Sequence, residues 1–371
     1  MKKADNRGLC IVSYPLSKAF NVPIFNLSKI FSEIDKTQLI LGISDPIQIS
    51  KNRSLDVHII PYQTGTFRLK QIFRYILLNV RIVFKLFSLR HEYGQIIFFM
   101  ESPPVLPIFF SFLFCKKRYW LLPSKIFSIS KGLFPRIESL LSYFGYWLSD
   151  GIIIYSPHIV AEWSLESNCH KIFFAHEHFL DFGTFTNTTP ISIRPRCIGY
   201  IGRLSEEKGV QNFIFALPAI LRNQPDLAIF IGGEGPLREM IVTFLKEKGL
   251  TDRVDLMGWI SHEDLPHYLN HISLLILPSY TEGLPNIMLE AMACGTPVLT
   301  TPVGAIPDVI RDDETGFIMG DNSPECITEN VIRALSSPDL ERIVENGRYF
   351  AKENFTFEKT VEQWREILDA I

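Results

Sequence analysis

The stretch 273–301 reads SLLILPSYTEGLPNIMLEAMACGTPVLTT and contains one complete strand–helix–strand unit. Its first five residues form a short apolar run that predicts a buried strand, and its last four predict a second strand. Between them, residues 286–293 predict a helix, with Pro285 suited to the first turn. Two parallel strands need a helical crossover of this kind, so the stretch favours an α/β fold.

The same alternation continues on both sides of this stretch. The further strands predicted in the C-terminal half are 197–202, 227–231, 254–257 and 316–319. The helices predicted around them are 210–221, 237–248, 262–270, 307–311, 324–336, 339–353 and 357–370. The strands are continuously apolar, which indicates that helices cover both faces of a doubly wound parallel sheet.

The N-terminal half repeats this rhythm less regularly. Its predicted strands lie near 8–14, 37–42, 57–60, 95–100, 118–122, 151–155 and 171–174. Residues 184–196 are polar, contain two prolines and are the best candidate for a linker. We therefore expect two Rossmann-like doubly wound parallel-sheet domains, 1–186 and 187–371, with an interdomain cleft. The last helix, 357–370, is expected to pack back on the N-terminal domain.

Length, cysteine usage and hydropathy exclude several classes of protein. The 371 residues suffice for two domains of ordinary size, and the six cysteines form no CxxC pair, which argues against a zinc site or a disulfide scaffold. No apolar run reaches the roughly 18–20 residues of a transmembrane helix. The N-terminus resembles a first strand more than a signal peptide. We therefore expect a cytoplasmic enzyme with reduced thiols.

The net charge of −3 conceals an asymmetry between the two halves. Residues 1–180 carry 21 Lys and Arg against 12 Asp and Glu, an excess of nine positive charges. The remainder carries 16 against 28, an excess of twelve negative charges. A basic half joined to an acidic half suggests two domains with different partners.

Glu290 is the one charged residue of the predicted helix 286–293, which is otherwise mostly apolar on all sides. A helix that is apolar all round is buried, and a buried carboxylate is costly unless a partner satisfies it. The partner is either a nearby basic group or backbone amide, or a ligand that offers hydroxyls, such as a ribose diol. Both alternatives stay open on the sequence alone.

Glu282 follows the first strand of the stretch and precedes its helix, so it lies at the carboxyl end of a strand. A carboxylate there is suited to sugar hydroxyls. The helix N-terminus would present the amides of Gly283, Leu284, Asn286 and Ile287, and the helix dipole there favours a phosphate or a sugar oxygen. Pro285, in the same loop, has no N–H to donate.

The segment GYIGRLSEEKG, residues 199–209, is the second candidate site. Gly202 ends a strand and allows a tight turn, and Arg203 and Lys208 follow it. Arg offers a fork of donors and Lys a point charge, and both suit the two to three negative charges of a diphosphate leaving group. The alternative is two solvated cations that pair with Glu206 and Glu207.

Two further strand ends in this half are weaker candidates. The loop GGEGP, 232–236, follows a strand and opens a helix, but a short glycine loop is more often an ordinary turn. Gly258 and Trp259 end the next strand, and Trp259 is a candidate neighbour of a nucleotide base.

The C-terminal half resembles retaining family-4 glycosyltransferases of the GT-B fold. The resemblance runs from Gly202 to about Phe317 and rests, in order, on GRLSEEKG, GGEGP, VDLMGW, PSYTEGLPNIMLEAMACGTPVLTTPVG and ETGF. Glu282 and Glu290 fit the Glu-x7-Glu motif of that family. The N-terminal segments DGIIIYSPHIV and KIFFAHEHFLDF are similar to microbial members with less specificity.

This resemblance implies roles for individual residues. Arg203 and Lys208 would stabilise the departing diphosphate, Glu282 and the loop from Gly283 to Asn286 would hold the donor sugar, and Glu290 would hold the ribose. The two cations would replace a divalent metal, so no metal and no cofactor beyond the UDP- or GDP-sugar co-substrate are expected. Retention would proceed by front-face attack, with the leaving phosphate helping to deprotonate the acceptor, a glycan or lipid-linked molecule.

The chain departs from the family pattern at two places in the N-terminal half. The Gly-Gly turn that many relatives have after the first strand is replaced by YPLSKAF, 14–20. Before the hinge, His176-Glu177-His178-Phe179 replaces an Asn-Gly that is frequent in relatives. His176, His178 and Glu101 are candidate cleft residues, against the alternative that they are structural.

Residues 68–90 predict a long helix on which Lys70, Arg74, Arg81 and Lys85 share one narrow stripe, while most other positions are apolar. A basic surface with exposed apolar residues would dock on an anionic membrane, peripheral at the inner face of the cell membrane. The alternative is a core-packed helix with one solvated basic face. No nucleic-acid module is present, so nucleic acid is not an expected partner.

Rival functions remain for the same sequence. A sugar-nucleotide epimerase would need a donor but no acceptor, and a phosphorylase would need a pyridoxal-binding lysine, for which the sequence offers no case. A Rossmann dehydrogenase would need GxGxxG after the first strand, which residues 8–35 lack. A non-catalytic partner subunit would have no need of Arg203, Lys208, Glu282 and Glu290.

Overall fold

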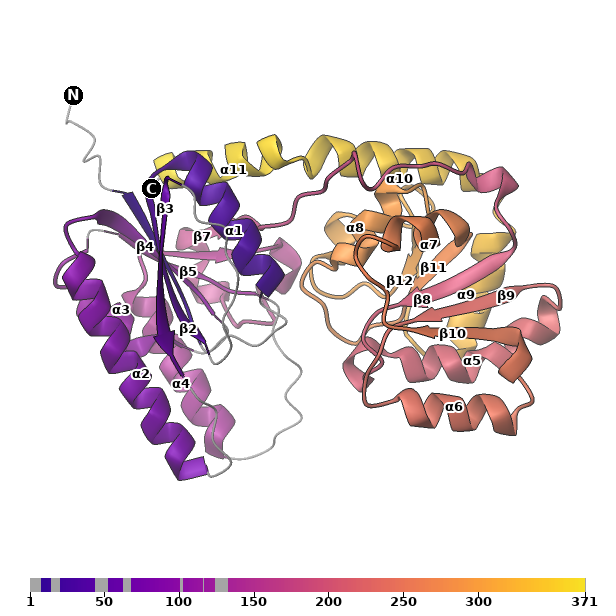
Figure 1. Ribbon diagram of the computed structural model, residues 1–371, viewed down its shortest axis with the longest axis horizontal. Helices are drawn as coiled ribbons and strands as arrows, with labels where there is room; N and C mark the ends of the chain where they lie inside the picture. Colours follow the sequence, from indigo (N-terminus) through magenta and orange to yellow (C-terminus); the bar gives the residue numbers. More distant parts are fainter. Residues whose placement is uncertain are drawn as a thin grey trace. The chain divides into compact units, whose positions relative to one another are not determined.

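The chain folds into two compact units (Figure 1). The computed structural model describes residues 8–14, 21–43, 53–62, 68–100, 103–115, 117–123 and 133–370. Unit 1 comprises Met1–His178 together with Thr360–Ile371, and unit 2 comprises Phe179–Lys359.

Unit 1 is built, over its described residues, on a parallel sheet of seven strands in the order β3-β2-β1-β4-β5-β6-β7. The strands are β1 (Gly8–Ser13), β2 (Thr37–Ile43), β3 (Leu55–Pro61), β4 (Tyr93–Phe99), β5 (Lys117–Leu121), β6 (Gly151–Ile154) and β7 (Ile172–Phe174). The helices are α1 (Asn21–Ile34), α2 (Arg68–Leu89), α3 (Val105–Ser111) and α4 (Leu133–Leu148), with 3₁₀ turns at Pro157–Ile159 and Glu166–Lys171.

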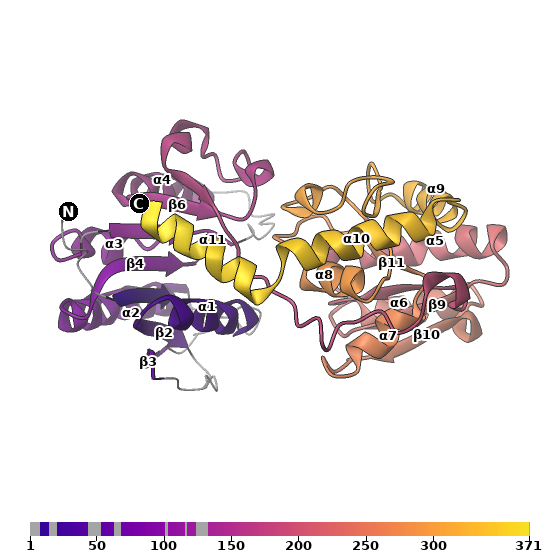
Figure 2. The same ribbon diagram turned by 90° about the horizontal axis from the view of Figure 1, so that it is seen from above.

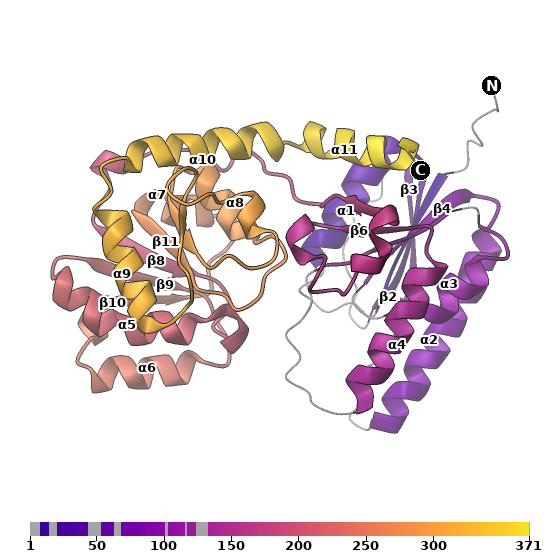
Figure 3. The same cartoon turned by 180° about the vertical axis from the view of Figure 1, so that it is seen from behind.

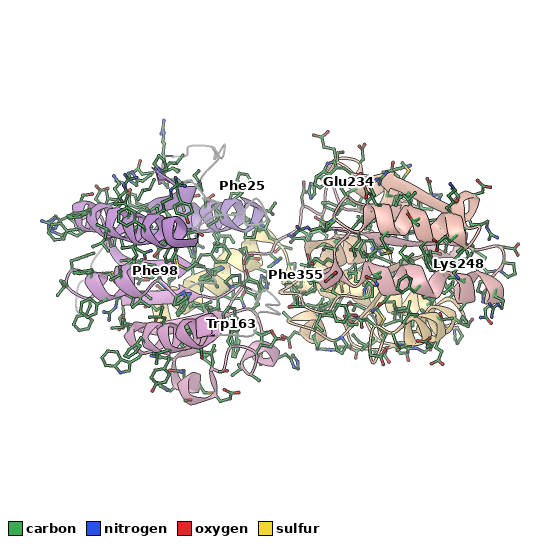
Figure 4. The ribbon with its side chains drawn as sticks, turned by 90° about the horizontal axis from the view of Figure 1, so that it is seen from below. Phe25, Phe98, Trp163, Glu234, Lys248 and Phe355 are labelled. Carbon is green, nitrogen blue, oxygen red and sulfur yellow. The ribbon has the colours of Figure 1, made fainter. Side chains whose placement is uncertain are left out.

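Helices lie on both faces of this sheet because its strands are apolar on both sides. On one face Val12, Phe98 and Trp120 pack with residues of α2, α3 and α4, and Phe98, labelled in Figure 4, is fully buried. The end of the chain, within α11 (Phe357–Ala370), packs against α1 in the same unit. There the rings of Phe31 and Trp364 meet edge to face at 4.7 Å.

Unit 2 forms a second parallel sheet, with six strands in the order β10-β9-β8-β11-β12-β13. The strands are β8 (Cys197–Ile201), β9 (Ala228–Gly232), β10 (Val254–Gly258), β11 (Leu274–Leu277), β12 (Val298–Thr300) and β13 (Phe317–Ile318). The helices are α5 (Val210–Asn223), α6 (Arg238–Glu247), α7 (Leu265–His271), α8 (Asn286–Ala293), α9 (Pro324–Leu335) and α10 (Leu340–Asn354). Short 3₁₀ turns occupy Ile191–Ile193, Glu206–Lys208, Thr251–Arg253 and Ile306–Asp308.

The core of unit 2 fills one face of its sheet with α5, α6 and α9, while α7 and α8 cover the other (Figure 1). Helix α10 lies against α8 (Figure 2). Helix α8 is therefore enclosed, which explains why its residues 288–293 are all buried although one of them is a glutamate.

The predicted α/β fold of two parallel-sheet domains is confirmed, and each predicted strand is present to within two residues at either end. The linker prediction for 184–196 was wrong. The amides of Thr188 and Thr189 donate to Asn270 Oδ1 at 2.8 and 3.3 Å, and Asn270 Nδ2 donates to the carbonyl of Thr186 at 3.0 Å. The segment is polar because it makes these hydrogen bonds within unit 2.

Among the described residues, no helix is both long enough and apolar enough to cross a membrane.

Candidate active site

The order of the strands in unit 2 reverses between β8 and β11, which are neighbours in the sheet. The loops that follow these two strands lie at the topological switch point, where ligands bind in open parallel sheets. The loop after β8 carries Arg203 and Lys208, and the loop after β11 carries Glu282. Sheet topology thus places the two predicted segments at one edge of the sheet.

The two loops touch backbone to backbone at Gly209. This glycine has φ +63°, and a Cβ there would lie 1.9 Å from the carbonyl oxygen of Pro278. No other residue tolerates both the left-handed conformation and this approach. The contact brings the end of the Lys208 segment against the start of the Glu282 loop, and the amide of Tyr280 donates to the carbonyl of Glu207 at 2.9 Å.

Lys208 and Glu282 form the central ion pair of this site. Lys208 Nζ lies 2.7 Å from both Oε1 and Oε2 of Glu282, and Ser279 Oγ donates to Oε1 at 2.7 Å. The Glu282 side chain is 9% exposed and the Lys208 side chain 32%. Lys208 is therefore not a solvated cation paired with Glu206 or Glu207, because its partner is the carboxylate across the switch point.

Arg203 behaves differently from Lys208. Its side chain is 67% exposed, and its Nη1 lies 3.7 Å from Glu207 Oε1, the contact that the solvated alternative predicted. A pair that long and exposed contributes little to stability. The structure therefore brings Lys208 and Glu282 together and leaves Arg203 on the rim of the loop with most of its guanidinium accessible.

The Glu282 loop is held from the turn after β12. The amide of Ala305 donates to the carbonyl of Gly283 at 2.8 Å, and Thr301 Oγ1 donates to the carbonyl of Ser279 at 2.6 Å. Gly304 has φ +59°, and a Cβ there would lie 2.0 Å from the carbonyl oxygen of Glu282. These contacts fix the backbone on which the Glu282 carboxylate stands.

The same loop leads directly into α8. Gly283, Leu284 and Pro285 are buried, and the helix begins at Asn286 with Pro285 as its N-cap. The first amides of a helix have no carbonyl partner within it, and the helix dipole adds partial positive charge there. The N-terminus of α8 thus follows closely after Glu282, and its amides can donate hydrogen bonds to an anionic or hydroxyl oxygen.

The glycine turns at the other strand ends have a structural explanation. The amide of Gly202 donates to Gly232 at 3.0 Å, and a Cβ on Gly233 would lie 1.8 Å from the carbonyl oxygen of Gly202. The GGEGP loop therefore packs against the turn after β8 and shapes it. Trp259, after β10, is 80% exposed.

Glu290 is buried on α8 and has a basic partner. It is 6% exposed, and its Oε1 lies 3.0 Å from Nε2 of His262, whose side chain is 71% exposed. The hydrogen bond to Glu290 raises the pKa of His262, although partial burial opposes the shift. His262 is therefore the nearby basic group that the first alternative required, and it contacts Oε1 of Glu290 but not Oε2.

Sequence reasoning missed His262 and Arg194. His262 was predicted inside a helix over 262–270, whereas α7 begins at Leu265 and His262 lies in the turn before it. Its position three residues after Trp259 at a strand end was the one available signal. Arg194 was assigned to the linker, but it is 7% exposed inside unit 2.

Arg194 joins the C-terminal ends of α7 and α8. Its Nη1 donates to the carbonyls of Leu269 and Ile272 at 3.0 and 2.9 Å, and its Nη2 donates to the carbonyl of Cys294 at 2.6 Å. Burial lowers the pKa of Arg194 to about 10, which leaves it charged near neutrality. A cation at two helix C-termini is favourable, and it fixes the helix that carries Glu290.

The N-terminal candidates lie in unit 1, after β7. Glu177 is 1% exposed and accepts a hydrogen bond from Tyr155 Oη at 2.8 Å, and burial raises the pKa of Glu177 to about 7. Burial lowers the pKa of His176 to about 3, so this imidazole is neutral. The carbonyls of His176 and His178 accept hydrogen bonds from Trp364 and Thr360. Glu101 and residues 15–20 lie outside the described residues.

Within the described ranges, no group of three or more His, Cys, Asp or Glu side chains is placed to hold a metal ion.

Comparison with known protein families locates this site in a recognised domain. Residues 185–350 match the model of the family described as Glycosyl transferases group 1. The matched range contains both switch-point loops, α8 and His262. This part of the chain is therefore a glycosyl transferases group 1 domain.

Two of the curated relatives illustrate the likeness in sequence. The chain is 34% identical over 149 residues to alpha-D-kanosaminyltransferase of Streptomyces kanamyceticus, which covers 40% of this chain and 39% of the relative. It is 30% identical over 178 residues to N-acetyl-alpha-D-glucosaminyl L-malate synthase of Bacillus anthracis, covering 48% and 46%. The chain thus spans less than half the length of these relatives.

Solved structures extend the likeness to both units. Sucrose-phosphate synthase from Thermosynechococcus elongatus matches with a TM-score of 0.76 at 18% identity, covering 98% of this chain and 100% of that one. Anabaena HepE in complex with UDP-glucose matches with a TM-score of 0.73 at 15% identity, covering 98% and 100%. At these identities the likeness establishes the fold, which is GT-B.

Proposed function

We propose that this protein is a retaining, metal-independent family-4 glycosyltransferase that moves a hexosyl unit from a UDP- or GDP-sugar to a glycan or lipid-linked acceptor. The observation that carries the proposal is the Lys208–Glu282 pair at the switch point of a glycosyl transferases group 1 domain. The glycosyltransferase names of the relatives and the UDP-glucose complex of HepE support it. We infer a role in surface polysaccharide or glycoconjugate synthesis, at the cytoplasmic side of the cell membrane.

Lys208 and Arg203 are assigned to the diphosphate of the donor. The Lys208 ammonium has three N–H donors. The two carboxylate oxygens of Glu282 accept from two of them, so one donor remains for a phosphate oxygen. The exposed Arg203 guanidinium adds a planar fork for the same group. Fixed cations aimed at a leaving group stabilise the charge that develops as the bond to the sugar breaks, which is the role a divalent metal would otherwise fill.

Glu282, Glu290 and the N-terminus of α8 are assigned to the rest of the donor. Glu282 and the loop of Gly283, Leu284, Pro285 and Asn286 hold the sugar, Gly202 lets the backbone approach, Glu290 accepts from the ribose, and Trp259 lies by the base. In the transfer step the bond from the anomeric carbon to the phosphate oxygen breaks, and the acceptor oxygen bonds on the same face. The acceptor proton passes to the departing phosphate.

A turnover assay with site variants tests this assignment. The purified chain is incubated with UDP-, GDP- and ADP-sugars in excess EDTA with candidate acceptors, and nucleoside diphosphate release is measured. We expect Lys208→Ala, Glu282→Ala and Arg203→Ala each to lower transfer roughly 10²-fold or more, because each removes a transition-state contact. Lys248→Ala, at the exposed end of α6 (Figure 4), is the matched control. Near-normal turnover in all three variants, or a strict need for metal, contradicts the proposal.

We also propose that an anionic membrane surface is a partner of unit 1. Helix α2 buries only one side, including Leu78, Ile82 and Leu86. Its exposed apolar residues form a second stripe: Phe73, Ile76, Leu77, Val80, Phe84 and Phe87. A helix packed entirely in a core would not leave such a stripe in water, so the core-packed alternative describes only part of α2.

The exposed apolar surface continues over the neighbouring helices. Helix α3 packs against both α2 and α4, and the three helices can be followed in Figure 3. The exposed large apolar residues on and just after α3 and on α4 are Leu106, Phe109, Phe110, Phe112, Leu113, Leu140, Leu141, Tyr143, Phe144 and Trp147. We call these residues and the α2 stripe the apolar face.

Charge favours an anionic bilayer as the occupant of the apolar face. Residues 68–90 contain no Asp or Glu. Arg74 and Arg81 of α2 line a hollow of about 270 Å³ together with Tyr62 and Pro61, and guanidinium groups there suit phosphate headgroups. A flotation assay with vesicles containing anionic lipid tests the proposal. The chain should float at low salt, and failure to do so contradicts it.

A further inference from the structure

The turn before α7 places an exposed histidine against a buried carboxylate of the candidate site. His262 Nε2 lies 3.0 Å from Glu290 Oε1. An ionised carboxylate only accepts hydrogen bonds, so the imidazole N–H is the donor. Among the described residues, Oε1 of Glu290 has a hydrogen-bond partner and Oε2 has none, and the residue is 6% exposed. One oxygen is thus engaged by the protein and the other is left for a ligand to meet.

The imidazole is held in this position although most of its surface is exposed. The ring of Phe185, which is 3% exposed, meets the ring of His262 at 5.2 Å between centroids with an interplanar angle of 66°. Phe185 belongs to the segment that Asn270 anchors through the carbonyl of Thr186. The anchored segment therefore supports the His262 ring through Phe185.

We propose that His262 is a positioning residue of the nucleotide site, which holds Glu290 Oε1 so that Oε2 accepts from a hydroxyl of the bound ribose. The inference rests on the proposed function, because it names the ligand group that Glu290 meets. It assigns to His262 a role in recognising ribonucleotides, and to Phe185 the support of that histidine.

The energetics separate this role from that of an ordinary surface ion pair. Loss of His262 leaves the buried Glu290 carboxylate without this partner, so some loss of stability is expected that does not depend on the ligand. A hydrogen bond from a ribose hydroxyl to the charged Glu290 carboxylate is strong when its geometry is fixed. Part of that strength is lost when the carboxylate is free to rotate. The cost should therefore appear in nucleotide binding, and only when the nucleotide has hydroxyls for Glu290 to meet.

A thermodynamic cycle between protein and ligand tests the inference. Dissociation constants of UDP and GDP, and of their 2′,3′-dideoxy analogues, are measured for the wild-type chain, His262→Ala and His262→Gln. We expect His262→Ala to weaken binding of the ribonucleotide about tenfold and to leave binding of the dideoxy analogue unchanged within about twofold. His262→Gln, whose amide can also donate, should restore most of the ribonucleotide affinity. His267→Ala, which changes an exposed histidine on α7, is the control.

The outcomes distinguish the inference from the function beneath it. Equal losses for the ribonucleotide and its dideoxy analogue, or no loss for either, overturn the role of His262 while nucleotide binding stands. If neither UDP nor GDP binds the wild-type chain, the proposed function fails and the inference falls with it. The thermal unfolding midpoint of each variant is measured as well, and binding is compared at a temperature at which every variant is folded.

Discussion

Unit 1 and unit 2 are both parallel sheets covered by helices, yet their surfaces differ in how many large apolar residues they expose. In unit 2, segments that look mobile in sequence are tied down: residues 186–189 by Asn270, and Arg194 by three carbonyls. Among the described residues, its exposed large apolar residues are fewer than those of unit 1, and they include Ile193 and Tyr349. In unit 1 the apolar face spreads over three neighbouring helices.

The difference is consistent with different binding partners for the two units. Scattered apolar residues are normal on a protein surface, whereas a contiguous set marks an interaction. A site that stabilises charge must be rigid, because misplaced donors lose their effect, and unit 2 provides that rigidity. The comparison supports our proposals that the donor binds to unit 2 and that an anionic membrane surface is a partner of unit 1.

The largest effect should come from breaking the anchoring of unit 2 at Arg194. Replacement with Met removes the donor shared by several buried carbonyls, and each hydrogen bond to a charged group contributes about 1.5–3 kcal/mol. We expect the free energy of unfolding to fall by about 3 kcal/mol or more, measured by urea unfolding of the full chain. Arg196→Met, two residues away and exposed, should change it by less than about 0.5 kcal/mol.

Equal unfolding of the Arg194 and Arg196 variants would show that the anchoring is not a source of stability. The comparison between anchored and exposed segments would then lose its energetic basis, although the geometry would stand.

A smaller effect should come from the apolar face of unit 1. Phe112→Ser and Trp147→Ser alter side chains that are 65% and 70% exposed. We expect the double variant to lower partition onto anionic vesicles about tenfold, because two aromatic anchors are lost, with little change in stability. Ile193→Ser and Tyr349→Ser in unit 2, at 73% and 68% exposure, are the matched controls. Unchanged flotation of the Phe112/Trp147 variant would remove the apolar face as the docking surface.

The sequence predicted most of unit 2 because its signals are local. Apolar runs marked the strands, and Pro285 marked the first turn of α8, which has the predicted bounds of 286–293. The strand order of the sheet, which the sequence left open, brings Lys208 and Glu282 to one edge. Their direct ion pair was not foreseen, because it depends on the close approach of Gly209 to Pro278.

The missed features are those that depend on tertiary packing. Arg194 lies in a polar, proline-containing segment, and nothing local shows that it enters the space between α7 and α8. His262 contacts a residue 28 positions away, and its placement depends on where α7 begins. The apolar stripe of α2 could not be separated from its core side by periodicity, because the helix is apolar at most positions and only its neighbours decide which are covered.

The most direct test of the central claim is equilibrium binding of UDP-, GDP- and ADP-sugars to the purified chain in EDTA, by titration calorimetry, with Lys208→Ala and Lys248→Ala alongside. The account predicts that at least one donor binds the wild-type chain without metal, that Lys208→Ala weakens this binding about tenfold or more, and that Lys248→Ala does not. No binding by any donor, or equal binding by wild type and Lys208→Ala, would contradict the assignment of the switch-point loops of unit 2 to a nucleotide sugar.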